Sequence, residues 1–147
     1  MIGARLGYTA LLWLMIPWVF WHLASRARRQ RGYLQHVGER FGRYSVAPAK
    51  PVIWLHAVSV GETRAAVPLV ERLLAAYPDH QILLTHMTPT GRAAAEQLFG
   101  NRVLRCYLPY DYPFAVKRFL GHFRPAAGLL METEIWFNLI HACREIG

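Results

Sequence analysis

The sequence predicts an α/β protein in which an N-terminal membrane helix precedes a Rossmann-like parallel sheet. Residues 6 to 24 form an apolar run without a charged side chain. From residue 51 onward, four apolar segments of strand length alternate with four helical patterns. Such alternation with short connections is typical of parallel sheets. A length of 147 residues suits one globular unit with its own core.

The apolar run predicts a membrane anchor helix over residues 1 to 25. About 20 residues cross a hydrocarbon core of roughly 30 Å, and Trp13, Trp18 and Trp21 are aromatics of the kind found near headgroups. Pro17 is tolerated in such a helix but is expected to kink it. A cleaved signal peptide would need a basic start and a shorter apolar core. A buried core helix is the other alternative, but three tryptophans and flanking arginines are unusual for one.

Residues 26 to 50 form a basic connector. Residues 1 to 50 hold eight Lys or Arg against one acid, Glu39. Four arginines follow the apolar run directly, and we expect them to contact anionic lipid headgroups: Arg26, Arg28, Arg29 and Arg31. Under the positive-inside rule, the chain after the run lies in the cytoplasm. A nucleic-acid role is not favoured, because no recognition module or stacking platform accompanies the arginines.

The motif GERFG, residues 38 to 42, contains that single acid between arginines. One interpretation is a solvated turn in which Glu39 pairs locally with Arg40 or Arg43. The other is a site role for Glu39 and Arg40. The sequence favours neither.

The α/β domain is expected over residues 51 to 147. Its predicted strands are residues 51 to 57, 81 to 87, 102 to 108 and 126 to 131, and its predicted helices are residues 63 to 76, 92 to 99, 112 to 123 and 133 to 145. The two cysteines, Cys106 and Cys143, lack metal-ligand spacing, and we expect both to be buried in a reducing compartment.

Four strand-to-helix turns should meet at the carboxyl edge of this sheet, where open α/β folds bind ligands. The small and hydroxyl residues of the first two turns suit anion binding, although they are also common helix N-caps. The third turn is residues 109 to 111. The candidate residues of the other turns are Ser59, Gly61 and Glu62, then Thr88, Thr90 and Gly91, and finally Glu132 and Glu134.

Each acid of these turns, taken alone, is explained by stabilisation of the first turn of its helix. Glu62 and Glu132, however, follow the first and fourth strands at the same edge. Two carboxylates that approach each other raise one another's proton affinity, which is how a general base is tuned near neutral pH. The pair therefore indicates an acid/base site.

Five motifs together resemble the 3-deoxy-D-manno-octulosonic acid (Kdo) transferases of lipopolysaccharide synthesis. They are GERFG, HAVSVGET, THMTPTGR, YLPYD and METEIWFN, and they occur in the family's order behind an N-terminal apolar segment. The resemblance implies the N-terminal half of a GT-B glycosyltransferase with two Rossmann domains. It also implies an inverting reaction without a catalytic metal or bound cofactor, in which CMP-Kdo donates Kdo to a hydroxyl of a lipid A precursor.

The resemblance assigns the roles of the two acids by motif. Glu62 of SVGE corresponds to the proton acceptor, and Glu132, the first acid of METE, to the second site acid, which supports the transition state. The residues expected to bind the acceptor are Ser59, Gly61, Thr88, Thr90, Gly91, Glu39, Arg40 and Glu134. The implied location is the bacterial inner membrane, with the globular domain on its cytoplasmic face.

Two departures from the family pattern matter. The chain has Phe137 where the family usually has proline, and it ends at Gly147, before the donor domain that would hold CMP-Kdo. We therefore expect no transfer by this chain alone. Two alternatives remain open. One is a non-catalytic, membrane-tethered module that binds lipid or a partner, and the other is a membrane glycosyltransferase with different substrates.

Overall fold

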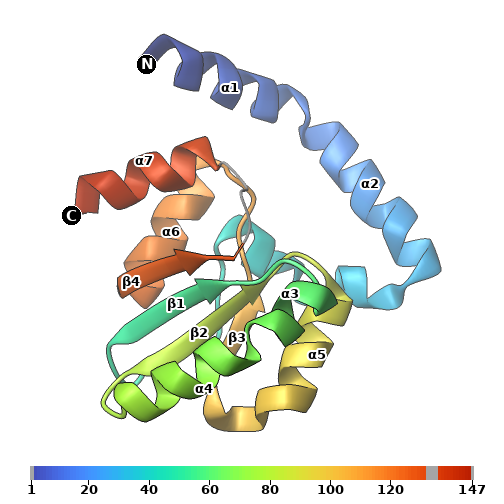
Figure 1. Cartoon of the computed structure of the whole chain (residues 1–147). Coiled ribbons are helices and arrows are strands. Elements are labelled where there is room, and N and C mark those ends of the chain that lie inside the picture. The colour runs from blue at the N-terminus through green and yellow to red at the C-terminus, as the bar shows by residue number, and fades with distance from the viewer. Residues whose placement is uncertain (1, 132–135, 147) are drawn as a thin grey trace.

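The computed structural model describes residues 2–131 and 136–146, and its centre is a four-stranded parallel sheet (Figure 1). The strand order is β3-β2-β1-β4. The strands are β1 (Val52–His56), β2 (Gln81–His86), β3 (Leu104–Tyr107) and β4 (Pro125–Leu130). The predicted parallel α/β architecture is confirmed. The inner strands β1 and β2 are covered by helices on both faces of the sheet, and their residues accordingly form nearly continuous apolar runs.

Helices cover both faces of the sheet. On one face lie α3 (Val60–Ala65), α4 (Val67–Ala76) and α5 (Pro89–Phe99), and their core includes Leu55, Val70 and Phe99. On the other face lie α6 (Pro113–Phe123) and α7 (Phe137–Ile146), which bury Trp54, Phe119 and Leu139. Successive residues of β1 thus serve opposite cores, as the twofold repeat of a strand requires.

Two predicted helices have different bounds in the structure. The helix expected over residues 63 to 76 begins at Val60 and is divided at Ala66 into α3 and α4. Pro68 explains the division, because proline has no N–H to continue the preceding helical ladder. The helix expected to start at Thr133 begins at Phe137 among the described residues, and Trp136 lies outside it.

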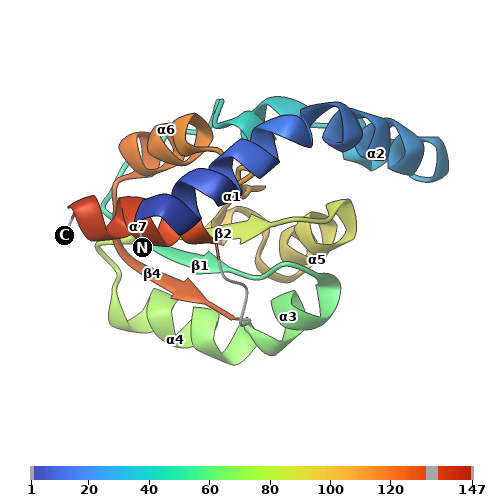
Figure 2. The same ribbon diagram turned by 90° about the horizontal axis from the view of Figure 1, so that it is seen from above.

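The N-terminal apolar segment is a bent pair of helices, α1 (Ile2–Leu14) and α2 (Ile16–Arg29). Helix α1 runs over the top of the domain, and α2 descends along its right-hand side in Figure 1 (Figures 1 and 2). The kink expected at Pro17 is present, with a bend of 54° between the two helices. Within the described chain, no single helix is long and apolar enough to cross a membrane, and only this bent pair reaches the required length and hydropathy. The predicted single membrane helix is therefore not established.

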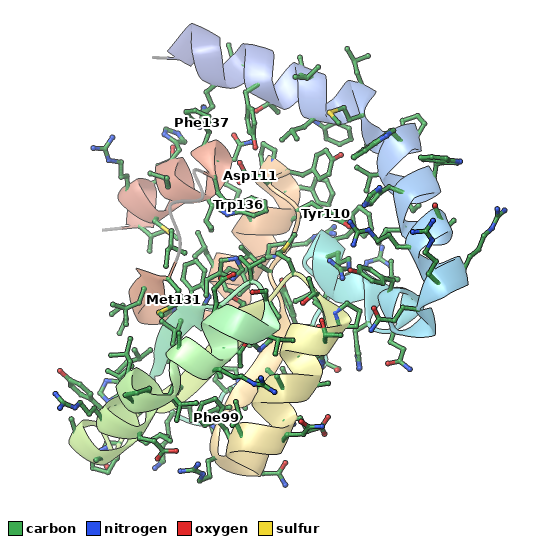
Figure 3. The ribbon with its side chains drawn as sticks, turned by 45° about the vertical axis from the view of Figure 1, so that its right-hand side comes forward. Phe99, Tyr110, Asp111, Met131, Trp136 and Phe137 are labelled. Carbon is green, nitrogen blue, oxygen red and sulfur yellow. The ribbon has the colours of Figure 1, made fainter. Side chains whose placement is uncertain are left out.

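Helix α1 packs against the globular domain. The Tyr112 hydroxyl donates to the Leu12 carbonyl at 2.9 Å, and the Thr9 hydroxyl donates to Asn138 Oδ1 at 3.2 Å. The rings of Tyr8 and Phe137 lie 5.1 Å apart, and Figure 3 shows Phe137 between α7 and α1. These contacts connect the first helix to the N-termini of α6 and α7.

Candidate active site

The crevice between β1 and β4 is the topological switch point of the sheet. Helix α3 leaves β1 toward one face, whereas α7, which follows β4, covers the other face. Ligands of open α/β folds bind outside the carboxyl ends of the strands at such a point. The Met131 N–H donates to the His56 carbonyl at 3.1 Å. The chain therefore enters METE directly beside the turn that contains SVGE.

Glu62 lies in the first turn of α3 and is half-buried. Its Oε2 accepts the Val58 N–H at 2.6 Å, and its Oε1 accepts the Ser59 hydroxyl at 2.8 Å. This arrangement corresponds to the acid half of a capping box, in which an acid three residues after the N-cap bonds back to the start of the helix. The Ser59 hydroxyl donates to Glu62 and caps no helix N–H. The expected first-turn capping is thus present, and the same two bonds orient the carboxylate.

The second turn packs directly against the first. Thr88 is the N-cap of α5, where its Oγ1 accepts the Gly91 N–H at 3.1 Å and donates to the Val58 carbonyl at 3.3 Å. A Cβ at Gly91 would lie 3.2 Å from both the Val58 oxygen and the Ser59 carbonyl carbon. Glycine at this position therefore allows α5 to approach the Ser59 turn closely.

Ser59, Glu62, Thr88 and Gly91 are brought together at one edge, whereas Thr90 points outward. Thr90 is exposed, and its hydroxyl lies 3.4 Å from that of Thr88. At Gly61 the nearest atom to an added Cβ would be Ser59 Oγ at 3.9 Å, so this position is open. Their binding of an acceptor stays a prediction.

Two buried histidines, His56 and His86, pack beneath these turns, and neither was among the predicted site residues. His86 Nδ1 donates to the Ala57 carbonyl at 2.8 Å, and His56 Nδ1 lies 2.8 Å from the Thr85 hydroxyl. Burial lowers the pKa of each to about 4, so both are neutral at pH 7. Their contacts join residues far apart in sequence, which no local pattern reveals.

Glu39 and Arg40 lie in a 3₁₀ helix, η2 (Val37–Phe41), and are buried. Glu39 Oε2 accepts Arg92 Nη1 at 2.6 Å and the Tyr107 N–H at 2.8 Å. The Arg40 guanidinium stacks 4.1 Å from the Tyr107 ring centre and donates to the Met87 carbonyl at 3.1 Å. The solvated turn with a local ion pair is therefore wrong, because the partners come from β3 and α5. A role of Glu39 and Arg40 in acceptor binding stays a prediction.

Asp111, in the third turn, caps α7. Its carboxylate accepts the N–H groups of Asn138 and Leu139, both at 2.9 Å. Burial raises its pKa, against the lowering effect of these hydrogen bonds. Figure 3 shows Asp111 close to Phe137, at the start of the helix that follows METE. Its partners are 27 or 28 residues away, so no local sequence pattern indicates this role.

The connector arginines Arg26, Arg28 and Arg29 form the last turn of α2 and are exposed. Arg26 also bonds the Tyr33 hydroxyl at 3.2 Å. Arg31 begins the 3₁₀ helix η1 (Arg31–Leu34). The cluster is thus attached to the apolar helix pair, but its contact with lipid stays a prediction.

A cavity of about 750 Å³ lies between helices α6 and α7 and the face of the sheet formed by β4 and Trp54 of β1. Its lining is mostly apolar and includes Leu120, Ala127 and Ile140. Because it lacks convergent polar groups, it does not fit a site for acid/base chemistry. The polar residues at the carboxyl ends of β1 and β2 fit one better.

Comparison with known proteins shows the family to which the chain belongs. Residues 35–147 match the model described as 3-deoxy-D-manno-octulosonic-acid transferase (kdotransferase). The chain belongs to the Kdo transferase family. It is 45% identical over 149 residues to a 3-deoxy-D-manno-octulosonic acid transferase of Bordetella pertussis, an alignment covering 95% of this chain and 34% of that protein.

Two further Kdo transferases show the breadth of the relationship. The Haemophilus influenzae enzyme is 40% identical over 139 residues, covering 93% of this chain and 33% of that protein. A probable mitochondrial Kdo transferase of Arabidopsis thaliana is 41% identical over 139 residues, covering 92% and 30%. The chain thus spans about a third of the length of these relatives.

Phe137, which replaces the proline of the Kdo transferase motif, is the first residue of α7. Proline is favoured at that helix position because its fixed φ suits the first turn, but it is not required there. In this chain, the Asp111 cap stabilises the same turn. Glu132 and Glu134 lie outside the described residues, so their predicted roles remain predictions.

Proposed function

We propose that this chain forms the acceptor-side part of a glycosyltransferase that moves Kdo from CMP-Kdo to a hydroxyl of a lipid A precursor. The observation that supports this most directly is the position of Glu62. A half-exposed carboxylate stands at the switch point of the sheet, oriented by hydrogen bonds to both of its oxygens. Membership in the Kdo transferase family supports Kdo as the transferred sugar.

In the proposed reaction, Glu62 acts as the general base. It removes the proton from the acceptor hydroxyl while that oxygen attacks the anomeric carbon of Kdo. The bond from this carbon to the phosphate oxygen breaks, and CMP leaves with the electron pair. A single displacement inverts the anomeric configuration, and the proposed step uses no metal ion. Glu132 would support the transition state, and the polar turn residues Ser59, Thr88 and Thr90 would orient the acceptor.

We further propose that helices α1 and α2 hold the domain on the cytoplasmic face of the bacterial inner membrane. The pair exposes large apolar side chains, including Leu14 at 78% and Trp21 at 66%. The exposed arginines of α2 follow directly, and each Lys or Arg near an anionic surface contributes about 1 kcal/mol to binding. A bent pair that also contacts the domain is suited to lying within one leaflet, close to the lipid acceptor.

A chimera tests the catalytic proposal. Residues 1 to 147 would replace the matching N-terminal region of the Haemophilus influenzae relative, and Kdo transfer to a lipid A precursor would be assayed. Glu62→Gln should lower the rate about 10²- to 10⁴-fold, the usual contribution of a general base. Glu71→Gln on α4, which removes an exposed carboxylate, serves as the matched control.

Retained turnover by the Glu62→Gln chimera would contradict the assignment. A loss of activity no greater than the loss of folded protein would instead favour a purely capping role. The thermal midpoint of each variant separates these outcomes, because loss of a helix cap costs only about 1 kcal/mol.

A further inference from the structure

A second cavity, of about 450 Å³, lies between α1, α6 and α7. These three helices meet on the face of the sheet opposite α3, which contains Glu62. None of the lining residues is among the described residues of the candidate active site, so the cavity is separate from it. Figure 2 shows α1 crossing above α7 beside α6.

The cavity lining is amphipathic. Leu6, Pro113, Phe114 and Ala142 supply apolar surface. Arg5 of α1 and Lys117 of α6 supply positive charge, and within the described part of the chain neither makes an ion pair. The acid of the cavity, Glu145, is 3.2 Å from His141 Nε2 and is mostly exposed. Two cations without an acidic partner thus stand beside an apolar wall.

We propose that this cavity binds one anionic membrane phospholipid. Its phosphate would pair with Arg5 and Lys117, and the adjoining part of an acyl chain would lie against Leu6 and Phe114. Charge complementarity favours a phosphate, because the two cations come from different helices and face the same space.

The outer surface of α1 favours a lipid over a free anion. Leu6 is 59% exposed, and Leu11 and Leu14 extend the apolar surface along the same helix. This step rests on the proposed membrane association of α1. A lipid seated here would contact α1, α6 and α7 together, and would add to the contacts through which α1 already packs on the domain, such as Thr9 with Asn138.

Native mass spectrometry of the full chain in detergent micelles tests the proposal. The probe is phosphatidylglycerol, compared with zwitterionic phosphatidylcholine and with inorganic phosphate. We expect one saturable phosphatidylglycerol per chain, at least about tenfold tighter than phosphatidylcholine. Inorganic phosphate at equal concentration should not displace it.

The decisive variant is Arg5→Gln with Lys117→Gln, which should weaken phosphatidylglycerol binding at least tenfold. The matched control, Arg43→Gln with Arg72→Gln, removes two charges from exposed positions away from the cavity and should bind normally. Lys117→Glu alone reverses one exposed charge and should also weaken binding. Equal affinities of the double variant and the control would overturn the proposal, as would equal binding of the two lipids or efficient displacement by phosphate.

Flotation with vesicles of phosphatidylcholine and phosphatidylglycerol separates this site from membrane association in general. The double variant should still float, because the exposed apolar side chains and the arginines of α2 are unchanged. Loss of flotation would mean that the two cations act only as part of a nonspecific basic surface, which would also overturn the specific site. The Glu62→Gln chimera should keep the lipid, so failure of the catalytic proposal leaves this test intact.

Discussion

Two of the sequence motifs that contain an acid, GERFG and SVGE, have opposite environments in the structure. Glu39 of GERFG is 4% exposed, and Oε2 is held by Arg92 and the Tyr107 N–H. Glu62 of SVGE is half-exposed at the switch point, and its partners come from the turn just before it. Long-range partners connect Glu39 to the core of the domain, whereas the partners of Glu62 are local and its side chain remains half-exposed.

This contrast separates a structural acid from a candidate base. A buried carboxylate requires a charged or hydrogen-bonding partner, and removing one member of such a pair leaves the other uncompensated. A carboxylate used for proton transfer must instead reach substrate. The same residue type in two short motifs therefore predicts a loss of stability at one position and a loss of rate at the other.

Among single substitutions near pH 7, the largest effect on stability is expected for Glu39→Gln. The change leaves Arg92 without its carboxylate, and Arg92 is only 20% exposed. We expect the free energy of unfolding to fall by about 2 to 3 kcal/mol. Urea denaturation measures it, with Glu96→Gln as the control, because Glu96 is 69% exposed and lies 3.6 Å from Arg105. Equal stability of the two variants would contradict a structural role for Glu39.

The next effect concerns pH and the histidines beneath the SVGE turn. Burial lowers the folded-state pKa of His56 and His86 to about 4, whereas in the unfolded chain a histidine titrates near 6.5. The unfolded chain therefore binds more protons between these values. The contribution of the two neutral histidines to the free energy of unfolding is fully present above about pH 6.5 and is lost as the pH falls toward 4. By pH 5 the loss is about 2 kcal/mol for each histidine.

Unfolding midpoints between pH 7.5 and 5 measure this loss. His86→Asn keeps a donor for the Ala57 carbonyl and should roughly halve the pH dependence attributed to the two histidines. His80→Asn, in the turn before β2 and outside the buried pair, should leave it unchanged. A slope unaffected by His86→Asn would show that His86 does not titrate as proposed.

The smallest effect distinguishes the two glycines of the candidate site. In Gly91→Ala the added Cβ would lie within 3.2 Å of the backbone of Val58 and Ser59. We expect the steric cost of this contact to exceed the gain of about 1 kcal/mol that alanine brings over glycine in a helix. We expect a net loss of up to about 1 kcal/mol. Gly61→Ala meets nothing closer than 3.9 Å and should be neutral or stabilising. Thermal unfolding measures both, and a stabilised Gly91→Ala would refute the close-approach role.

The sheet was predictable because its strands are short apolar runs that end in turn residues. The apolar segment before His56 and the one before His86 both predict buried strands, and both are found. The bounds of the helices were less predictable. Pro68 divides a continuous helical pattern, and α7 begins only where Asp111, 26 residues earlier than Phe137, can cap it.

The candidate site was predictable only in its local part. Ser59 and Glu62 lie within one turn, so their capping pattern is visible in the sequence. The pairing of Glu39 with Arg92 spans 53 residues, and the bond from His86 to Ala57 spans 29. Such partners depend on which strands are neighbours in the sheet, and this strand order cannot be derived from one sequence.

The most direct test measures Glu62→Gln and Glu39→Gln side by side in the chimera, recording both the Kdo-transfer rate of folded enzyme and the free energy of unfolding. The account predicts opposite outcomes. Glu62→Gln should lose about 10² to 10⁴ in rate with at most about 1 kcal/mol of stability. Glu39→Gln should lose stability while the folded fraction keeps its rate at saturating acceptor, where weaker acceptor binding alone would not lower the rate. Equal losses of rate in the two variants, or full activity of Glu62→Gln, would contradict it.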